Sequence, residues 1–145
     1  MNKYVLLVVA SVLSVGAQAE TVEFLNPPGL MAKGLPFSPA VRVGGQVYVT
    51  GQIGTTPGTT TLVSGGMAAE AKQSIQNIKS ILEANGYALR DVVKCTVMLA
   101  DMSEWAAFNE VYKSAFTPPY PARSAFGANG LAFGAKVELD CIAAR

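Results

Sequence analysis

Apolar residues recur at helical spacing in two segments of the chain, and the first segment runs from residue 67 to residue 84. Small and apolar side chains return there every three or four positions, while charged and amide side chains fall largely between them. Gly86 follows at a place where helices commonly end. The pattern predicts an amphipathic helix, whose inward positions are Ala68, Ala71, Ile75, Ile78, Ile81 and Leu82.

The second helical pattern is the stretch EWAAFNEVYKSAF, residues 104–116. Ser103 is expected to cap its N-terminus, because a hydroxyl group there can accept a hydrogen bond from a free backbone N–H. The prolines of TPPYP, residues 117–121, end the helix. The side chains expected to face inward are Trp105, Phe108, Ala115 and either Val111 or Tyr112.

Short β-branched and apolar runs predict strands around these helices. Two strands, Ala40 to Val43 and Gln46 to Ile53, are joined by Gly44-Gly45, a dipeptide typical of hairpin turns. DVVKCTVMLA, residues 91–100, predicts a buried strand between the helices, and two more strands follow the second helix. The order β-β-α-β-α-β-β favours an α+β fold in which two helices pack on one face of a sheet.

The two final strands are predicted at residues 122–128 and 136–144. In the last of them, KVELDCIAA, alternation places Lys136, Glu138 and Asp140 on one face and the apolar residues and Cys141 on the other. The apolar face suits packing against the helices. The acidic residues therefore point away from the helices and need either water or a cationic partner.

The first twenty residues, MNKYVLLVVASVLSVGAQAE, form a separate segment. Lys3 precedes an uncharged apolar run up to Val15, and Ala17-Gln18-Ala19 has the A-x-A form of a cleavage site. A membrane anchor is the alternative, but the run is shorter than the roughly 20 residues that span hydrocarbon. We expect residues 1–19 to be a signal peptide cleaved after Ala19, with residues 20–145 forming one secreted or periplasmic domain that has no membrane contact.

Composition narrows the chemistry that this domain can perform. The chain has 11 Lys and Arg against 10 Asp and Glu, so removal of Lys3 with the signal leaves 10 against 10. Attraction to phosphate backbones is then weak, and a nucleic-acid partner is not expected. The chain contains no histidine. Ser-His-Asp and Cys-His catalysis and histidine-ligated zinc are therefore excluded, and carboxylates, arginine, hydroxyls, thiols or backbone groups must carry any reaction.

Cys95 and Cys141 are the only cysteines. In an exported chain they would meet an oxidising compartment, where two thiols can form one intramolecular disulfide. Each cysteine also lies in an apolar run, so two buried free thiols are an equally good interpretation. Geometry has to decide between them.

Arg123 is the one charged residue of YPARSAFGANG, residues 120–130. It lies on the strand that precedes Glu138, and a short connection allows the two strands to be neighbours, so a guanidinium and a carboxylate could share one pocket. One interpretation is an ordinary ion pair. The other is a site in which Arg123 binds a substrate carboxylate through two parallel hydrogen bonds while Glu138 orients or deprotonates water. That arrangement suits hydrolysis of a small anionic substrate.

Three further positions are weaker candidates. Asn109 interrupts a half-apolar helix, where it could contact a ligand or simply face solvent. Thr50 and Gly51 end a strand, where a glycine permits close approach of a ligand but more commonly marks a bend or bulge. Phe37 lies between prolines and would ordinarily be a packed aromatic residue.

From about Gly34 to Ala144 the chain resembles the RidA family, also called YjgF/YER057c/UK114. The matching pieces, in order, are VYVTGQIG, AAEAKQSIQNIKSILEANG, DVVKCTVMLADMSEWAAFNEVYKSAF, PPYPARSAFG and KVELDCIAA. Their order and spacing together are specific to the family. The resemblance implies a chorismate-mutase-like α+β fold and a homotrimer with active sites in the clefts between subunits.

The resemblance also implies an activity, the hydrolytic deamination of reactive 2-imino acids and enamines, similar to 2-iminobutanoate/2-iminopropanoate deaminase. The products are 2-keto acids and ammonia, and the reaction needs neither a cofactor nor a metal. The family's arginine falls on Arg123, which would hold the substrate carboxylate, and its glutamate falls on Glu138, which would activate water. Asn109 and Gly51 match the family's helix asparagine and strand-end glycine.

Three positions depart from the family pattern. Phe37 stands where deaminase members commonly have a tyrosine, and Thr50 replaces a common serine. Ala125 replaces a common cysteine, although the role implied for that position belongs to its backbone carbonyl. The connection GANGLAFGAK, residues 127–136, also lacks charges that are frequent there. These departures leave carboxylate binding and water activation in place and leave the size and polarity of the substrate open.

Two other functions compete with deamination. The first is non-catalytic binding of small carboxylate metabolites in the cleft between subunits. In that case Arg123 binds a ligand and Glu138 catalyses no reaction. The second is the endoribonuclease activity known for some family members, which the neutral charge of the mature chain disfavours.

Overall fold

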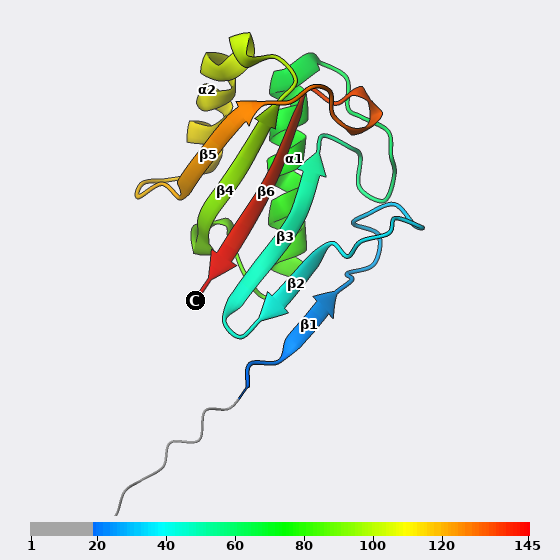
Figure 1. The fold of residues 1–145 in the computed structure, drawn as a ribbon, viewed down its shortest axis with the longest axis vertical. Coiled ribbons are helices and arrows are strands. Elements are labelled where there is room, and N and C mark those ends of the chain that lie inside the picture. The colour runs from blue at the N-terminus through cyan, green and yellow to red at the C-terminus, as the bar shows by residue number, and fades with distance from the viewer. Residues whose placement is uncertain (1–18) are drawn as a thin grey trace, which may run out of the picture.

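The computed structural model describes residues 19–145, so the expected signal peptide lies outside the described residues apart from Ala19. Within this range the chain forms one mixed sheet and two α-helices (Figure 1). None of the described helices is long and apolar enough to cross a membrane.

The sheet has six strands in the order β1-β2-β3-β6-β4-β5. Neighbouring strands are antiparallel except β4 and β5, which are parallel. One strand, β1, was not predicted, and it extends the sheet by pairing with β2 along its whole length. The strands are β1 (Val22–Leu25), β2 (Ala40–Val43), β3 (Gln46–Ile53), β4 (Val92–Leu99), β5 (Ala122–Gly127) and β6 (Val137–Ala144).

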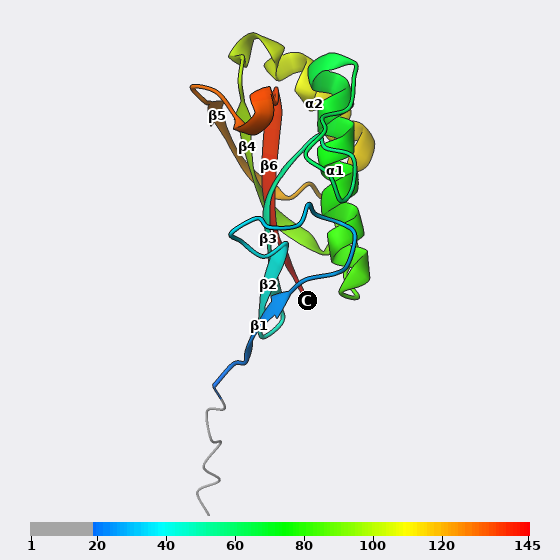
Figure 2. The ribbon, with the colours of Figure 1, turned by 90° about the vertical axis from the view of Figure 1, so that its right-hand side faces the viewer.

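Both helices, α1 (Gly66–Ala84) and α2 (Trp105–Ala115), lie on the same face of the sheet (Figure 2). The predicted layering is therefore confirmed. The predicted cap of the second helix is wrong, because a short 3-10 turn precedes α2 and moves the cap earlier in the chain. At that turn the Asp101 carboxylate accepts a hydrogen bond from the backbone N–H of Ser103 at 2.8 Å.

The core fills the space between the helices and the sheet. On β6 the apolar residues Val137, Leu139 and Cys141 are buried, while Glu138 and Asp140 on the other face are only partly buried. The predicted alternation of this strand is confirmed. The face of the sheet opposite the helices, here called the open face, carries the two acidic residues.

Cys95 and Cys141 form a disulfide that links β4 to β6 on the helix-facing side. They lie directly opposite each other in the ladder, with their Cα atoms 4.1 Å apart. Both cysteines are buried. Of the two interpretations that the sequence left open, the structure selects the disulfide.

The strand that carries Arg123 does not neighbour the strand that carries Glu138, because β4 lies between them. Arg123 is opposite Cys95 in the β4–β5 ladder, and Cys95 is opposite Cys141 in the β4–β6 ladder. Residues that are paired across neighbouring strands point to the same face, so Arg123 shares the helix-facing side with the disulfide. Glu138 points to the open face.

Candidate active site

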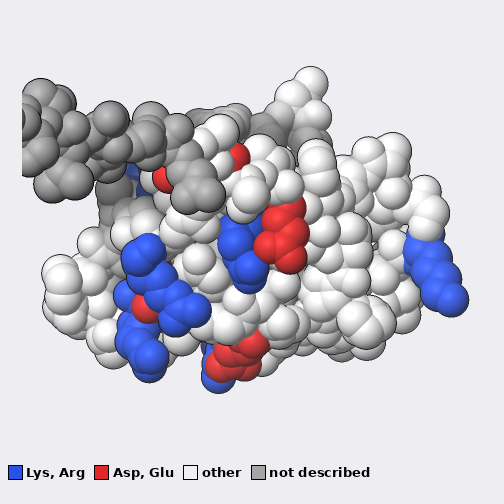
Figure 3. Space-filling model, turned by 90° about the horizontal axis from the view of Figure 1, so that it is seen from below, with Lys and Arg blue, Asp and Glu red and all other residues white. Residues whose placement is uncertain are grey.

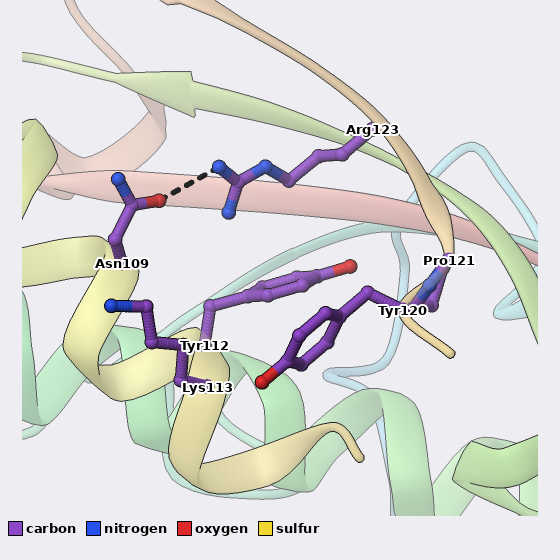
Figure 4. Close-up of a pocket in the computed structure, with 6 residues that line it drawn as sticks. All are labelled: Asn109, Tyr112, Lys113, Tyr120, Pro121 and Arg123. Carbon is purple, nitrogen blue, oxygen red and sulfur yellow. Dashed lines mark hydrogen bonds between the residues drawn. The ribbon is translucent and has the colours of Figure 1, made fainter. Parts of the chain in front are cut away.

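The Arg123 guanidinium is held against one side of α2. Its Nη2 donates a hydrogen bond to Asn109 Oδ1 at 2.7 Å (Figure 4). Its central carbon lies 4.7 Å from the ring centroid of Tyr112 and 5.0 Å from that of Trp105. These contacts combine a hydrogen bond with cation–π attraction, so the positive charge has a defined position before any ligand arrives.

The sequence of α2 explains why these groups meet. Trp105, Asn109 and Tyr112 are spaced four and three residues apart, which places them on one side of a helix. On β5, Arg123 points from the edge of the sheet toward that side. The Asn109 amide therefore lies on the Arg123 side of the helix, where it orients the guanidinium, and its contact with a ligand stays a prediction.

A cavity of about 400 Å³ lies beside this guanidinium. Its walls come from the second half of α2 and from the start of β5, and Figure 4 shows their side chains around the opening. The residues that line it are Asn109, Tyr112, Lys113, Tyr120, Pro121 and Arg123. The cavity thus combines one fixed cation with aromatic walls, which suits a small molecule that carries a carboxylate.

Glu138 lies on the open face, between β3 and β4. It is opposite Ile53 in one ladder and opposite Met98 in the other. Burial raises the pKa of its carboxyl group, and the neighbouring Asp140 carboxylate raises that pKa further. A raised pKa brings a carboxylate nearer to the value at which it exchanges protons efficiently near neutral pH.

Gly51 lies directly beneath the Glu138 carboxylate. A Cβ atom built on Gly51 would collide with Glu138 Oε1. The glycine is therefore needed for close approach and not for an unusual backbone angle. The register of β3 against β6 also shifts between Val49 and Gln52, as at a β-bulge. Both interpretations of this glycine therefore apply in part, and the group that approaches it closely in the structure is the Glu138 side chain.

A second cavity, of about 110 Å³, adjoins Glu138 and Gly51. Phe37 lines it, together with residues of the segment that precedes β2 and of the connection between β5 and β6. Most of its side chains are apolar. They include Leu30, Met31, Leu35, Ile53, Ala132 and Phe133.

The structure thus divides the predicted site into two groups. Arg123 and Asn109 line the first cavity, while Glu138, Gly51 and Phe37 line the second, and neither cavity includes residues of both groups. The expectation that Arg123 and Glu138 share a pocket is wrong within one chain. The physical reason is the insertion of β4 between their strands and the opposite direction of their side chains.

Two predicted residues line neither of these cavities. Thr50 precedes Gly51, and its backbone N–H donates to the carbonyl of Pro39 at 3.0 Å. Ala125 is opposite Val97 on the helix-facing side and packs against the core. Their implied contacts with a substrate stay predictions.

Sequence reasoning missed the aromatic surroundings of Arg123. The helical pattern predicts Trp105 and Tyr112 only as core residues, and no pattern in the sequence indicates a role for Tyr120. The spacing of Trp105, Asn109 and Tyr112 is the signal that could have identified this group, because it places an amide between two aromatic rings on one side of the helix.

Comparison with known proteins gives one consistent family. Residues 31–145 match the sequence model of the family described as Endoribonuclease L-PSP. A Mus musculus protein named 2-iminobutanoate/2-iminopropanoate deaminase is 44% identical over 108 residues, which cover 74% of this chain and 80% of that protein. The crystal structure of RidA from Psychrobacter sp. PAMC 21119 is 40% identical, with a TM-score of 0.80, and covers 85% of this chain and 99% of that one.

A yeast protein, YEO7, has a similar structure, with a TM-score of 0.81 and 38% identity over 86% of this chain and 99% of that one. The family match covers most of the chain, and the relatives and structures agree in both sequence and fold. The chain therefore belongs to the Endoribonuclease L-PSP family, which is the RidA/YjgF family that the sequence resembles.

Proposed function

We propose that this protein hydrolyses 2-imino acids to 2-keto acids and ammonia, with Arg123 as the carboxylate clamp and Glu138 as the group that activates water. One observation carries the proposal. Within residues 19–145 the fixed Arg123 guanidinium and the Glu138 carboxylate form no ion pair, with each other or with any other residue. A cation that is held in place without a carboxylate partner is available to a carboxylate ligand. The deaminase name of the Mus musculus relative supports the same reaction.

The site is complete only if a second copy of the chain contributes to it. Arg123 points to the helix-facing side of the sheet and Glu138 to the open face, so one small substrate cannot reach both in a single chain. The open face also exposes large apolar side chains, among them Phe126 and Tyr48. Another copy that covers this face would bury them. We propose the homotrimer implied by the family resemblance, with each site in a cleft between two copies.

In the proposed reaction, the substrate carboxylate accepts hydrogen bonds from Arg123. Water held by Glu138 attacks the imine carbon and a C–O bond forms, while Glu138 takes a proton from the water and passes it to the imine nitrogen, which gives a neutral carbinolamine. Glu138 then takes the proton of the new hydroxyl group as the C=O bond forms, and passes it to the nitrogen as the C–N bond breaks. Ammonia leaves, and Glu138 is again ionised. The overall reaction consumes one imine and one water and requires no oxidant or reductant.

Two other functions make different predictions for the same residues. A non-catalytic binder of small carboxylates would use Arg123 and would not require Glu138. Endoribonuclease activity is named in the family description. Binding to an RNA phosphate backbone requires a basic surface, and the net charge of the chain is only +1. Figure 3 shows a largely uncharged face on which basic and acidic side chains lie side by side.

The test is release of ammonia and 2-keto acid from imines that an amino-acid oxidase generates in place. The protein of residues 20–145 is compared with its Arg123→Ala variant. This substitution removes a side chain from a cavity wall and leaves the volume of the core unchanged. Acceleration by the parent protein that the variant loses supports the deaminase. No acceleration over spontaneous hydrolysis, for imines with small and large side chains alike, would contradict it. Binding of 2-keto acids by such an inactive protein would indicate the binder.

We also propose that residues 1–19 direct export to the periplasm or outside the cell. The Cys95–Cys141 disulfide supports this, because paired thiols are typical of oxidising compartments. Cell fractionation and N-terminal sequencing of the purified protein test it. A chain that begins at Glu20 in the exported fraction is the expected result. Full-length protein confined to the cytoplasm would contradict it.

A further inference from the structure

We propose that the cavity beside Glu138 receives the side chain of the substrate and selects 2-imino acids with apolar side chains of about leucine size, with Phe133 and Phe37 as specificity-determining residues. The inference rests on the proposed function, since it assigns the imine to the space above Glu138. It adds a substrate class, a first role for Phe133 and a specific role for Phe37, which the sequence indicates only as a weak candidate.

The walls of the cavity favour an apolar group. Eight of the lining residues have apolar side chains. The amide of Gln52 also lines it, but its Nε2 already donates to the carbonyls of Thr50 and Gly51 at 3.2 and 3.3 Å. The hydroxyl of Thr59 donates to the carbonyl of Thr56 at 2.9 Å. The Gln52 amide N–H groups and the Thr59 hydroxyl are therefore occupied by the protein itself. Besides Glu138, the other polar side chains of the lining are the two neutral hydroxyl groups of Thr55 and Thr60.

The charge of the cavity excludes acidic substrates. Glu138 is the one ionisable residue among its lining residues. A second carboxylate on the substrate would enter a partly buried space next to Glu138 without a cation to offset it. Apolar side chains meet no such penalty, so the site should discriminate by charge as well as by shape.

The size of the cavity sets the size of the side chain. An apolar cavity of about 150 Å³ is large enough to hold benzene. The cavity beside Glu138, of about 110 Å³, is somewhat smaller and suits a branched aliphatic group. A methyl group would leave much of it empty.

Phe133 is held in a conformation that local sequence preferences do not explain. Its φ angle is 57°, in the left-handed region that non-glycine residues rarely adopt. Its side chain is 62% exposed, so burial in the core does not compensate for this backbone conformation. Strained residues of this kind cluster at ligand sites. The ring of Phe133 nevertheless lines the cavity, as does that of Phe37, which is 49% exposed.

Two exposed aromatic rings at one cavity provide apolar area that a substrate side chain can cover. Phe37 has no hydroxyl group, so its ring adds apolar surface and no hydrogen-bonding group to the cavity. Both features point to the same class of substrate.

The experiment compares kcat/KM for imines derived from leucine, alanine and glutamate, in the parent protein and in Phe133→Asn. Asparagine tolerates a positive φ, so the variant removes the ring while keeping the backbone conformation. Phe24→Ala is the matched control, because Phe24 is 68% exposed and lines neither cavity. We expect the parent to prefer the leucine imine over the glutamate imine by at least about tenfold. Phe133→Asn should lose about tenfold on the leucine imine and little on the alanine imine, and Phe24→Ala should match the parent.

Equal rates for the leucine and glutamate imines in the parent, or an equal loss on all three imines in Phe133→Asn, would overturn the inference. Titration calorimetry with the 2-keto acids of leucine and glutamate separates it from the proposed function. If no imine is turned over, the proposed function fails, and tighter binding of the leucine keto acid, weakened by Phe133→Asn, still supports the cavity. Equal affinities for the two keto acids, or a higher affinity for the keto acid of glutamate, would overturn the inference.

Discussion

The carboxylate of Glu138 occupies the space above Gly51 in which any other residue would place its Cβ atom. The two residues belong to neighbouring strands, β6 and β3. The glycine therefore determines where the carboxylate lies. Its substitution should disturb the reaction more than the fold.

Gly51→Ala should force the Glu138 carboxylate to move. Since a displacement of about 1 Å at a reacting group can reduce a rate about 100-fold, we expect kcat for imine hydrolysis to fall by 10- to 100-fold. Binding of 2-keto acids through Arg123 should persist. Steady-state kinetics and calorimetry measure the two effects. A variant with parental kcat would show that the position of Glu138 above Gly51 has no part in catalysis.

Glu138→Gln keeps the size of the side chain and removes its ability to accept a proton. General-base catalysis contributes roughly 100- to 10,000-fold to such reactions, so kcat should fall within that range. The affinity for a 2-keto acid should stay close to that of the parent, because Arg123 is unchanged. An unchanged kcat would mean that another group activates water.

The pH dependence should report the environment of Glu138. Burial and the neighbouring Asp140 raise the pKa of its carboxyl group, and the group must be ionised to accept a proton. Activity should therefore decline as pH falls through the raised pKa. Asp140→Asn removes one negative charge, so the acid limb of the kcat/KM profile should move to lower pH. Superimposable profiles for parent and variant would contradict this coupling.

The same pKa shift predicts how stability changes with pH. The folded protein holds the Glu138 proton to a higher pH than the unfolded chain does, because its folded pKa is raised. The free energy of unfolding should then decrease as pH rises from the unfolded to the folded pKa. Glu138→Gln does not titrate and should lose less stability over this interval. Chemical denaturation of both proteins across the interval measures the difference, and parallel curves would refute it.

The Cys95–Cys141 disulfide closes a chain segment with a sequence separation of 46 residues. Loop-closure entropy for a segment of this length gives an upper value of about 4 kcal/mol, and measured losses are typically about 2–4 kcal/mol. Cys95→Ala combined with Cys141→Ala should reduce the free energy of unfolding by this amount. Urea denaturation measures it, and mass spectrometry of the alkylated parent checks that the thiols are paired. Equal denaturation midpoints would argue against a structural role.

Glu70 on α1 is buried and accepts a hydrogen bond from the backbone N–H of Lys136 at 2.7 Å. Lys136 directly precedes β6, so this contact fixes the strand that carries Glu138. Glu70→Ala leaves a backbone donor without its partner and should cost about 1–3 kcal/mol in unfolding free energy. Glu70→Gln should cost less, because its carbonyl oxygen can still accept.

A matched control for Glu70 lies on the same helix. Glu83 is exposed and lies 3.9 Å from Lys79, a surface contact of little energetic value. Glu83→Ala should change the unfolding free energy by less than about 0.5 kcal/mol. Equal effects of Glu83→Ala and Glu70→Ala would show that the buried hydrogen bond contributes nothing specific.

The sequence by itself determined the elements whose signals are local. The spacing of Ala71, Ile75 and Ile78 specified α1, and strict alternation specified which face of β6 carries Glu138. Each of these patterns needs only the geometry of one helix or strand. Strand β1 had no comparable signal, because its four residues become a strand only by pairing with β2.

The tertiary structure decided everything that depends on which strands become neighbours. Insertion of β4 between β5 and β6 separated Arg123 from Glu138, and the ladder registers sent their side chains to opposite faces. The same registers placed Cys95 against Cys141, and the packing of α2 placed Asn109 against Arg123. Strand order and register are set by the packing of the whole sheet against its helices, and no local pattern of residues encodes them.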